Sequence, residues 1–332
     1  MIAKQDVETR RPTNPAAEEI LGLYFPVLDH GFVALVDYMG SDEDVERAAR
    51  VSYGYGTRRT SQTRGLIRYL RRHRPTTPSA MVELKFHCAM PIFVARQWIR
   101  HRTANVNEYS GRYSLLPLVF YRPEAEQFQA QTSGNRQGRA GEPLTALHAE
   151  AVERWDELRR QASAHYEWLV GHDVARELAR IDLPLSVYTQ WYWKIDLHNL
   201  LHFLRLRVDP HSQYEIRAFA RVMAGMLARV APLSFEAWVD YALAGKPFSR
   251  GELTALRRLV HVADGGLEAQ AGRLDRAALE ACGLMPREVD ELLAKLAPPP
   301  ALEDFTLDPA AARPAEEFAR RMEEAVPRVD RR

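Results

Sequence analysis

The sequence from Val82 to Ser114, VELKFHCAMPIFVARQWIRHRTANVNEYSGRYS, holds a strand pattern, a helix pattern and a polar cluster in succession. The strand pattern is an alternation, typical of a strand with one buried face, whose apolar members are Val82, Leu84, Phe86 and Cys88. Pro91 is well placed as the first residue of a helix, so PIFVARQWIRHR is predicted to be helical. The polar cluster RHRTANVNEYSGRYS therefore starts at a helix C-terminus and continues as a loop.

Further strand and helix patterns surround this stretch. GFVALVDYMG (31–40) indicates a buried strand, and Ser41 with a carboxylate three residues later predicts a capped helix after it. Helical periodicity continues over about 144–170, about 186–206 and a long segment after residue 210. Ser249 and Glu252 form another capping box. We therefore expect an α+β fold, with mixed helices packed on an antiparallel sheet and a helical C-terminal extension.

The chain divides into three parts by composition. Residues 1–28 are polar and interrupted by prolines, as in an N-terminal arm; 29–246 form the main domain; and 247–332 form a helical, partly disordered C-terminal extension. The last long helix of the main domain carries an apolar stripe typical of a core or a subunit interface, namely Ile216, Phe219, Val222, Met223, Met226, Leu227 and Val230.

Composition excludes several functional classes. The chain has 332 residues, of which 46% are hydrophobic and 27% charged, as in soluble globular proteins. A formal net charge of +1 gives no global attraction to nucleic acid or anionic membranes. The first residues contain no signal-peptide core, and no window approaches the ~18 apolar residues of a membrane span. Cys88 and Cys282 form no CxxC pattern, so we expect a cytoplasmic protein without a thiolate metal site.

Standard catalytic motifs are missing or incomplete. There is no P-loop and no nucleophile elbow, and GYG (54–56) lacks the third glycine of a dinucleotide fingerprint. His198 and His202 lie one helical turn apart, but Asn199 stands where a zinc protease carries its glutamate. Contact with a ligand or another subunit is therefore favoured over metal binding. Cys88, on the apolar face of a strand, is interpreted as a core residue rather than a nucleophile.

The polar cluster permits two interpretations. A helix C-terminus favours cations, so RHR (100–102) could form a solvated helix end with Glu108 pairing an arginine. The local density instead favours a phosphorylated ligand, because arginine forks match phosphate oxygens. Downstream, Arg180 and Arg207 lie in a patch rich in tyrosine and tryptophan. Stacking surfaces beside guanidinium groups suit a nucleotide, a flavin or single-stranded nucleic acid, and composition leaves these open.

The segment RHRTANVNEYS, in which RHR is followed by seven residues and a serine, resembles the signature of the flavin-dependent thymidylate synthases. The flanking FVARQWIRHR and SGRYS agree, as does ARIDLPLSVYTQWYWKIDLHNLLHFLRLRVDPHSQYEIR downstream. The similarity covers about Asp29 to Lys246. It implies conversion of dUMP to dTMP with FAD as redox cofactor, 5,10-methylenetetrahydrofolate as carbon donor and NADPH as reductant, without an enzyme cysteine nucleophile. It also implies a homotetramer whose FAD and dUMP sites are shared between subunits; a non-catalytic nucleotide- or RNA-binding protein is the alternative.

Site residues follow from the resemblance position by position. Those implied for dUMP are Gln97, Trp98, Ile99, Arg100, Glu108, Tyr109, Ser110, Gly111, Arg112, Arg180 and Arg207. Arg207 is also the implied catalytic residue, a fixed cation that polarises the uracil. Those implied for FAD are Ser52, Thr77, Arg100, His101, Arg102, Glu108, Asp196, Leu197, His198 and His202. Ala80 replaces a glutamate of many members, and Asp196 and His202 replace asparagines of some, which affects the flavin contacts more than the dUMP site. No metal is expected.

Overall fold

The computed structural model describes residues 11–52, 63–132, 138–263, 266–270, 274–296, 298 and 302–328. The chain folds into two compact units, Met1–Glu236 with Phe305–Arg332, and Ala237–Asp304. The first ten residues of the expected arm, the GYG motif at 54–56 and residues 133–137 of the polar loop lie outside the described residues. Within the described part of the chain, no helix is long and apolar enough to cross a membrane.

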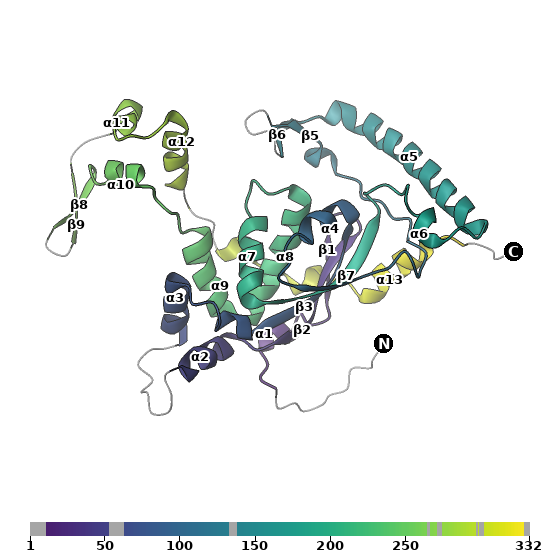
Figure 1. Cartoon of the computed structure of the whole chain (residues 1–332), viewed down its shortest axis with the longest axis horizontal. Coiled ribbons are helices and arrows are strands. Elements are labelled where there is room, and N and C mark those ends of the chain that lie inside the picture. The colour runs from purple at the N-terminus through teal and green to yellow at the C-terminus, as the bar shows by residue number, and fades with distance from the viewer. Residues whose placement is uncertain are drawn as a thin grey trace. The chain divides into compact units, whose positions relative to one another are not determined.

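An antiparallel sheet forms the centre of the first unit (Figure 1). Its strands, in spatial order, are β1 (Tyr24–Val27), β2 (Gly31–Met39), β3 (Glu83–Pro91), β7 (Tyr188–Asp196) and β4 (Asn105–Glu108). The alternation predicted for β3 is confirmed, since Leu84, Phe86 and Cys88 are fully buried while the residues between them are partly exposed. A small hairpin lies outside this sheet and pairs β5 (Gln129–Gln131) with β6 (Arg139–Pro143).

Helices pack on this sheet, so the predicted α+β class is confirmed. Those of the first unit are α1 (Pro15–Glu18), α2 (Asp42–Val51), α3 (Thr63–His73), α4 (Ile92–Trp98), α5 (Thr145–Gly171), α6 (Arg176–Ala179), α7 (Leu197–Arg207), α8 (Tyr214–Val230), α13 (Ala315–Glu324) and α9 (Pro232–Trp238), which ends just past the unit boundary. Helices α7 and α8 lie side by side (Figure 1). On α4, Trp98 is fully buried and lies 5.1 Å from Phe203 and 5.3 Å from Trp193, ring centre to ring centre.

The helix predicted over about 186–206 is wrong in its first half. Residues Tyr188–Asp196 form strand β7, which pairs along its whole length with β3. Trp191, Trp193 and Ile195 are buried at alternate positions, and aromatic and β-branched residues fit a pleated surface better than a helix. The helix starts only at Asp196, whose carboxylate caps it by accepting from the Asn199 backbone N–H at 2.9 Å.

Other predictions hold with adjusted bounds. The predicted helix over 144–170 is α5, and most of the apolar stripe on α8 is core, with Phe219 and Met223 fully buried. The capping box at Ser41 is present, because Asp44 accepts from the Ser41 backbone N–H at 3.0 Å. Helix α4 begins after Pro91 as predicted but ends at Trp98, so RHR lies in the turn that leads into β4.

Described residues of both terminal stretches pack on the first unit. In the stretch expected as an arm, Asn14 donates to the Val230 carbonyl at 3.2 Å, Ile20 is fully buried and β1 is an edge strand of the sheet. In the stretch expected as a partly disordered extension, residues 305–328 return to the sheet, where Phe318 of α13 packs on Phe32. The functional boundaries at 28/29 and 246/247 stay predictions.

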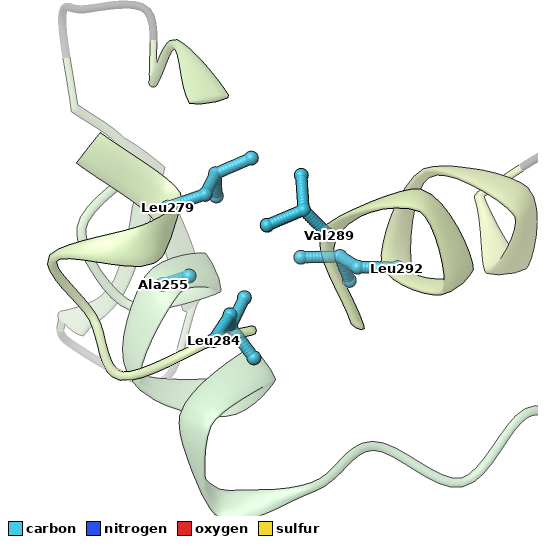
Figure 2. Packing of buried hydrophobic residues seen from close by; sticks show 5 residues of the cluster. All are labelled: Ala255, Leu279, Leu284, Val289 and Leu292. Atoms are coloured by element: carbon cyan, nitrogen blue, oxygen red, sulfur yellow. The ribbon is translucent and has the colours of Figure 1, made fainter. Parts of the chain in front are cut away.

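The second unit is a small helical body. It contains α10 (Arg250–Leu256), α11 (Arg276–Glu280), α12 (Pro286–Lys295) and the hairpin β8 (Val260–Ala263)–β9 (Gly266–Ala269). Figure 2 shows the cluster that holds the helices together, formed by Ala255, Leu279, Leu284, Val289 and Leu292. The predicted capping box is confirmed by the Ser249 N–H, which donates to Glu252 at 2.6 Å. Lys295 donates to the same carboxylate at 2.7 Å and holds the pKa of Glu252 below its usual range.

Candidate functional site

Strand pairing brings the two polar blocks of the sequence together. After α4 the chain turns through RHR and pairs as β4 with β7, so that Asn105 faces Lys194 and Glu108 faces Trp191. The Tyr109 backbone N–H extends this pairing by donating to the Gln190 carbonyl at 2.8 Å. Since α7 continues directly from β7, Arg207 of the second block lies close to RHR of the first, while Gly111 of the first block approaches Arg180 of the second.

The clearest contact between the blocks joins Arg207 to His101. The Arg207 guanidinium donates through Nε to His101 Nε2 at 3.0 Å, and the imidazole lies edge-on to Phe203 at 4.9 Å. An accepting Nε2 requires the neutral ring. Burial, the Arg207 charge and His202 together lower the pKa of His101 to about 4, and burial lowers the pKa of Arg207 as well. A half-buried guanidinium is therefore held by a neutral partner.

Several arginines of the two blocks have no internal counter-ion. Arg96, Arg100 and Arg102 are exposed and Arg180 is half-buried, and within the described residues none of these four side chains makes a hydrogen bond or ion pair. Glu108 does not pair with an arginine, because Thr189 Oγ1 donates to its Oε1 at 2.8 Å. A solvated helix end with Glu108 neutralising an arginine is thus not what the structure shows. An anionic ligand would supply the missing charge.

The segment after Glu108 is tightly folded. Tyr109 donates its hydroxyl to the Leu115 carbonyl at 2.7 Å, which closes the segment on itself. A Cβ at Gly111 would lie 3.0 Å from the Leu116 side chain and 3.1 Å from Arg180 Cδ, so a larger residue would push these side chains away by a few tenths of an ångström. Arg112 pairs with Glu177 at 2.9 Å, but the pair is more than half exposed and is weak enough to yield to a ligand.

The start of α7 carries the residues implied for FAD. The Asp196 carboxylate is already occupied as a helix cap, accepting from the backbone and side chain of Asn199 at 2.9 and 2.6 Å. His198 is partly buried, and burial with the nearby Arg71 and His202 charges lowers its pKa despite Asp196. Among the described residues, no group of three or more His, Cys, Asp and Glu could hold a metal ion.

The remaining assigned residues are less directly placed. Trp98 and Leu197 have fully buried side chains, so only their backbones are available to a ligand, while Ile99 is 38% exposed. Ser52 caps the end of α2, and Thr77 is exposed in the turn before Ser79–Met81. Neither has a described contact with the arginine group.

Two residues near the site were not identified from the sequence. Thr189 holds Glu108, and Arg71 on α3 acts electrostatically on His198. Recognising period-2 alternation in β7 would have pointed to Thr189, because it places residues 189 and 191 beside β4. Nothing in the sequence pattern connects α3 with α7.

The aromatic residues of the second block do not form an open stacking surface. Tyr188, Trp191, Trp193 and Phe203 are at most 2% exposed and belong to the core. Tyr192 is 45% exposed, but its ring stacks on His87 at 4.7 Å. Binding of single-stranded nucleic acid relies on accessible aromatic faces, which these buried rings do not offer.

The donor set fits a phosphorylated cofactor and a phosphorylated nucleotide. Cations without carboxylate partners suit phosphate oxygens, and Gln97 adds a buried Oε1 that accepts from no group in the described part of the molecule. Such an orphan acceptor suits a donor on a base or ring system. The residues present therefore fit FAD and dUMP chemically.

Comparison with known proteins agrees with this chemistry. Residues 34–233 match the family model described as thymidylate synthase complementing protein. A flavin-dependent thymidylate synthase from Gluconobacter oxydans is 51% identical over 295 residues, covering 87% of this chain and 92% of the relative. One from Ruegeria pomeroyi is 51% identical over 260 residues, covering 76% of this chain and 85% of the relative.

Solved structures agree as well. A UMP/dUMP methylase, PolB from Streptomyces cacaoi bound with 5-Br UMP, matches with a TM-score of 0.60 and 33% identity. The match covers 66% of this chain and 97% of the methylase. A second structure of that methylase, bound with 5-Br dUMP, matches equally well over 65% of this chain.

Proposed function

Because the chain belongs to the flavin-dependent thymidylate synthase family, we propose that it catalyses the reductive methylation of dUMP to dTMP. FAD is the redox cofactor, 5,10-methylenetetrahydrofolate the carbon donor and NADPH the reductant. The observation that carries the proposal is the Arg207–His101 contact, which joins the two polar blocks next to Arg100 and Arg102, whose side chains lack internal counter-ions.

The dUMP site is assigned to the segment Glu108–Arg112 with Gln97, Arg100, Arg180 and Arg207. Arginines meet the phosphate, and Arg112 can leave its exposed ion pair with Glu177 to do so. Arg207 acts differently, as a fixed cation beside the pyrimidine carbonyl. Its contact with His101 orients the guanidinium without neutralising it, so its full charge stabilises negative charge that develops on the uracil.

The flavin site is assigned to Arg100, His101 and Arg102 together with His198 and His202. When bound, FAD supplies the hydride chemistry of the reaction. The exposed arginines provide charge for its phosphates. Burial, with the nearby Arg71 charge, lowers the pKa of His198, so this histidine is neutral at physiological pH and offers one donor and one acceptor.

The mechanism needs no cysteine nucleophile. Cys88 is fully buried on β3, and burial raises the pKa of its thiol far above the usual range. A neutral, enclosed thiol cannot attack the uracil ring. Activation of dUMP therefore rests on Arg207.

Self-association as a homotetramer with shared sites is part of the proposal. On and after α5, large apolar side chains stay exposed in the single chain, with Leu158 at 60%, Trp168 at 56%, Ile181 at 69% and Leu185 at 63%. Beside them, a cavity of about 360 Å³ is lined mainly by apolar groups, including Phe93, Trp155 and Pro184. Exposed apolar surface of this kind marks association surfaces.

A purified-protein experiment tests the proposed function. The full-length protein should retain FAD with its visible absorption band, and NADPH should bleach that band. A protein without flavin that binds single-stranded RNA with steep salt dependence would instead support the non-catalytic alternative.

A further inference from the structure

The stretch Tyr109–Pro117, which begins with four of the residues assigned to dUMP, is called the nucleotide segment below. It is anchored at both ends on β7. Upstream, the Tyr109 N–H donates to the Gln190 carbonyl at 2.8 Å. Downstream, the Tyr188 N–H donates to the Val119 carbonyl at 2.8 Å, and the Tyr121 N–H donates to the Ser186 carbonyl at the same distance. The segment therefore leaves β7 and returns to it.

The C-terminal tail adds a contact at the downstream anchor. The Leu118 N–H, one residue past the nucleotide segment, donates to the Ala325 carbonyl at the end of α13 at 2.9 Å. Met322 and Ala325 also pack against the buried cluster of Val119, Tyr121 and Tyr188. Residues 118–121, which directly follow the nucleotide segment, thus contact both β7 and the tail.

The tail is itself fixed to the sheet over its length. Phe318 is 5% exposed and packs on Phe32 and Tyr24, with ring centres 5.0 and 6.0 Å apart. The Arg313 N–H donates to the Tyr24 carbonyl at 2.8 Å. Figure 1 shows α13, in yellow, beside the sheet. A cavity of about 260 Å³ is lined both by Tyr109 and Pro117 and by residues of α13 such as Phe318 and Met322.

We propose that the tail, residues 313–326, is a positioning element of the catalytic unit that holds the nucleotide segment in its dUMP-binding conformation. The inference rests on the proposed function, which assigns dUMP to this segment. An ordered segment loses less conformational entropy when its ligand binds, so the tail raises dUMP affinity without touching the nucleotide.

The tail should act on dUMP rather than on FAD. Successive residues of a strand face opposite sides of the sheet. On β7, Trp193 faces Phe203 of α7, the helix that carries His198 and His202, whereas Tyr192 and its stacking partner His87 face the side covered by α13. A general loss of folding would weaken both ligands, whereas a positioning role weakens dUMP alone.

Phe318→Ala in the full-length, FAD-loaded protein tests the proposal. We expect the Kd for dUMP, measured by calorimetry, to rise at least about fivefold, the lower end of typical coupling between sites. FAD stoichiometry should not change, and amide exchange at Leu118 should accelerate. Phe318→Leu should restore most of the affinity because it refills the apolar site. Arg320→Ala, whose side chain is 74% exposed on the same helix, is the matched control and should match wild type.

Two results would contradict the positioning role of the tail. An unchanged Kd for dUMP in a folded Phe318→Ala protein, or unchanged exchange at Leu118, would overturn the proposal. If Phe318→Ala does not fold, Met322→Ala, which shortens a side chain that packs on both the Phe32 and the Val119 clusters but leaves the Phe318 ring in place, must give the same loss of dUMP affinity. Wild-type protein that binds no dUMP overturns the proposed function and the tail's nucleotide role together, while Leu118 exchange still decides whether the tail orders this segment.

Discussion

Two partly buried arginines of the first unit are held in opposite ways. Arg139 donates to the Glu215 carboxylate at 2.5 Å, and that carboxylate, only 4% exposed, also accepts from Tyr121 at 3.1 Å and from Gln213 at 2.9 Å. Arg207 donates to the neutral imidazole of His101. The first arginine has its counter-ion within the fold, whereas the second keeps its charge available.

This difference separates a structural cation from a functional one. Removing a partner from a satisfied buried pair leaves an uncompensated charge and weakens the fold. Removing a cation that has no counter-ion within the fold lowers the stability of the fold little, because the charge of that cation interacts mainly with the bound ligand. The two sites should therefore respond to substitution in opposite ways, with activity lost at one and stability lost at the other.

The largest effect is expected for Arg207→Ala. Turnover to dTMP should fall by at least about 10²-fold, as on removal of a preorganised electrostatic group. Bound FAD and thermal stability should stay close to wild type. Product formation, FAD absorbance and thermal unfolding measure the three quantities, with Arg221→Ala on exposed α8 surface as control. Wild-type turnover in Arg207→Ala would refute the assigned role.

Glu215→Gln should give the converse result. Breaking a buried pair typically costs about 3 kcal/mol, so the midpoint of thermal unfolding should fall by roughly 5 °C or more. Turnover at low temperature should remain within about twofold of wild type, because the mechanism assigns no ligand to Glu215. If turnover falls while the midpoint of thermal unfolding stays unchanged, Glu215 acts in the active site. The contrast drawn between Arg139 and Arg207 is then wrong.

A smaller effect concerns pH. The pKa of His101 is about 4 in the fold, below its usual 6.5, so the unfolded chain takes up a proton here before the folded protein does. Stability from this residue is full above pH 6.5 and falls as the pH drops toward 4. Thermal unfolding from pH 7 to 4.5 should therefore show a smaller acid loss in His101→Asn than in wild type. An equal loss of thermal stability in both proteins would show that the fold does not lower the pKa of His101.

Cys88→Ala should have the smallest effect on turnover. The thiol is enclosed between β2 and β7 and lies outside the arginine group, so turnover should stay within about twofold of wild type while stability falls modestly. A folded, flavin-loaded Cys88→Ala protein without turnover would reopen the question of a cysteine nucleophile.

The sequence predicted elements where a single periodic pattern decides the structure. Val82 to Cys88 alternates without interruption and forms β3, and the apolar stripe from Ile216 to Val230 lies on the buried helix α8. The pattern of segment 188–196 suggests a helix because both faces of β7 carry aromatic side chains, which obscures period-2 alternation. The packing of the tail on the sheet is not visible in its own sequence, because it depends on Phe32 and Tyr24, far away in sequence.

The site assignments themselves stay predictions, but one proximity that the motifs suggest is present. Arg207 of the second block contacts His101 of the first, and β4 pairs with β7 beside them. That Glu108 is held by Thr189, and that Arg207 meets a histidine instead of a carboxylate, depends on tertiary contacts that residue spacing does not encode.

Release of tritium from C5-labelled dUMP tests the central claim most directly. The full-length protein, loaded with FAD and given 5,10-methylenetetrahydrofolate, should release tritium and form dTMP when NADPH is supplied. Arg207→Ala should release tritium at least about 10²-fold more slowly. Absence of release from the wild-type protein under any combination of flavin, folate and reductant would contradict the account.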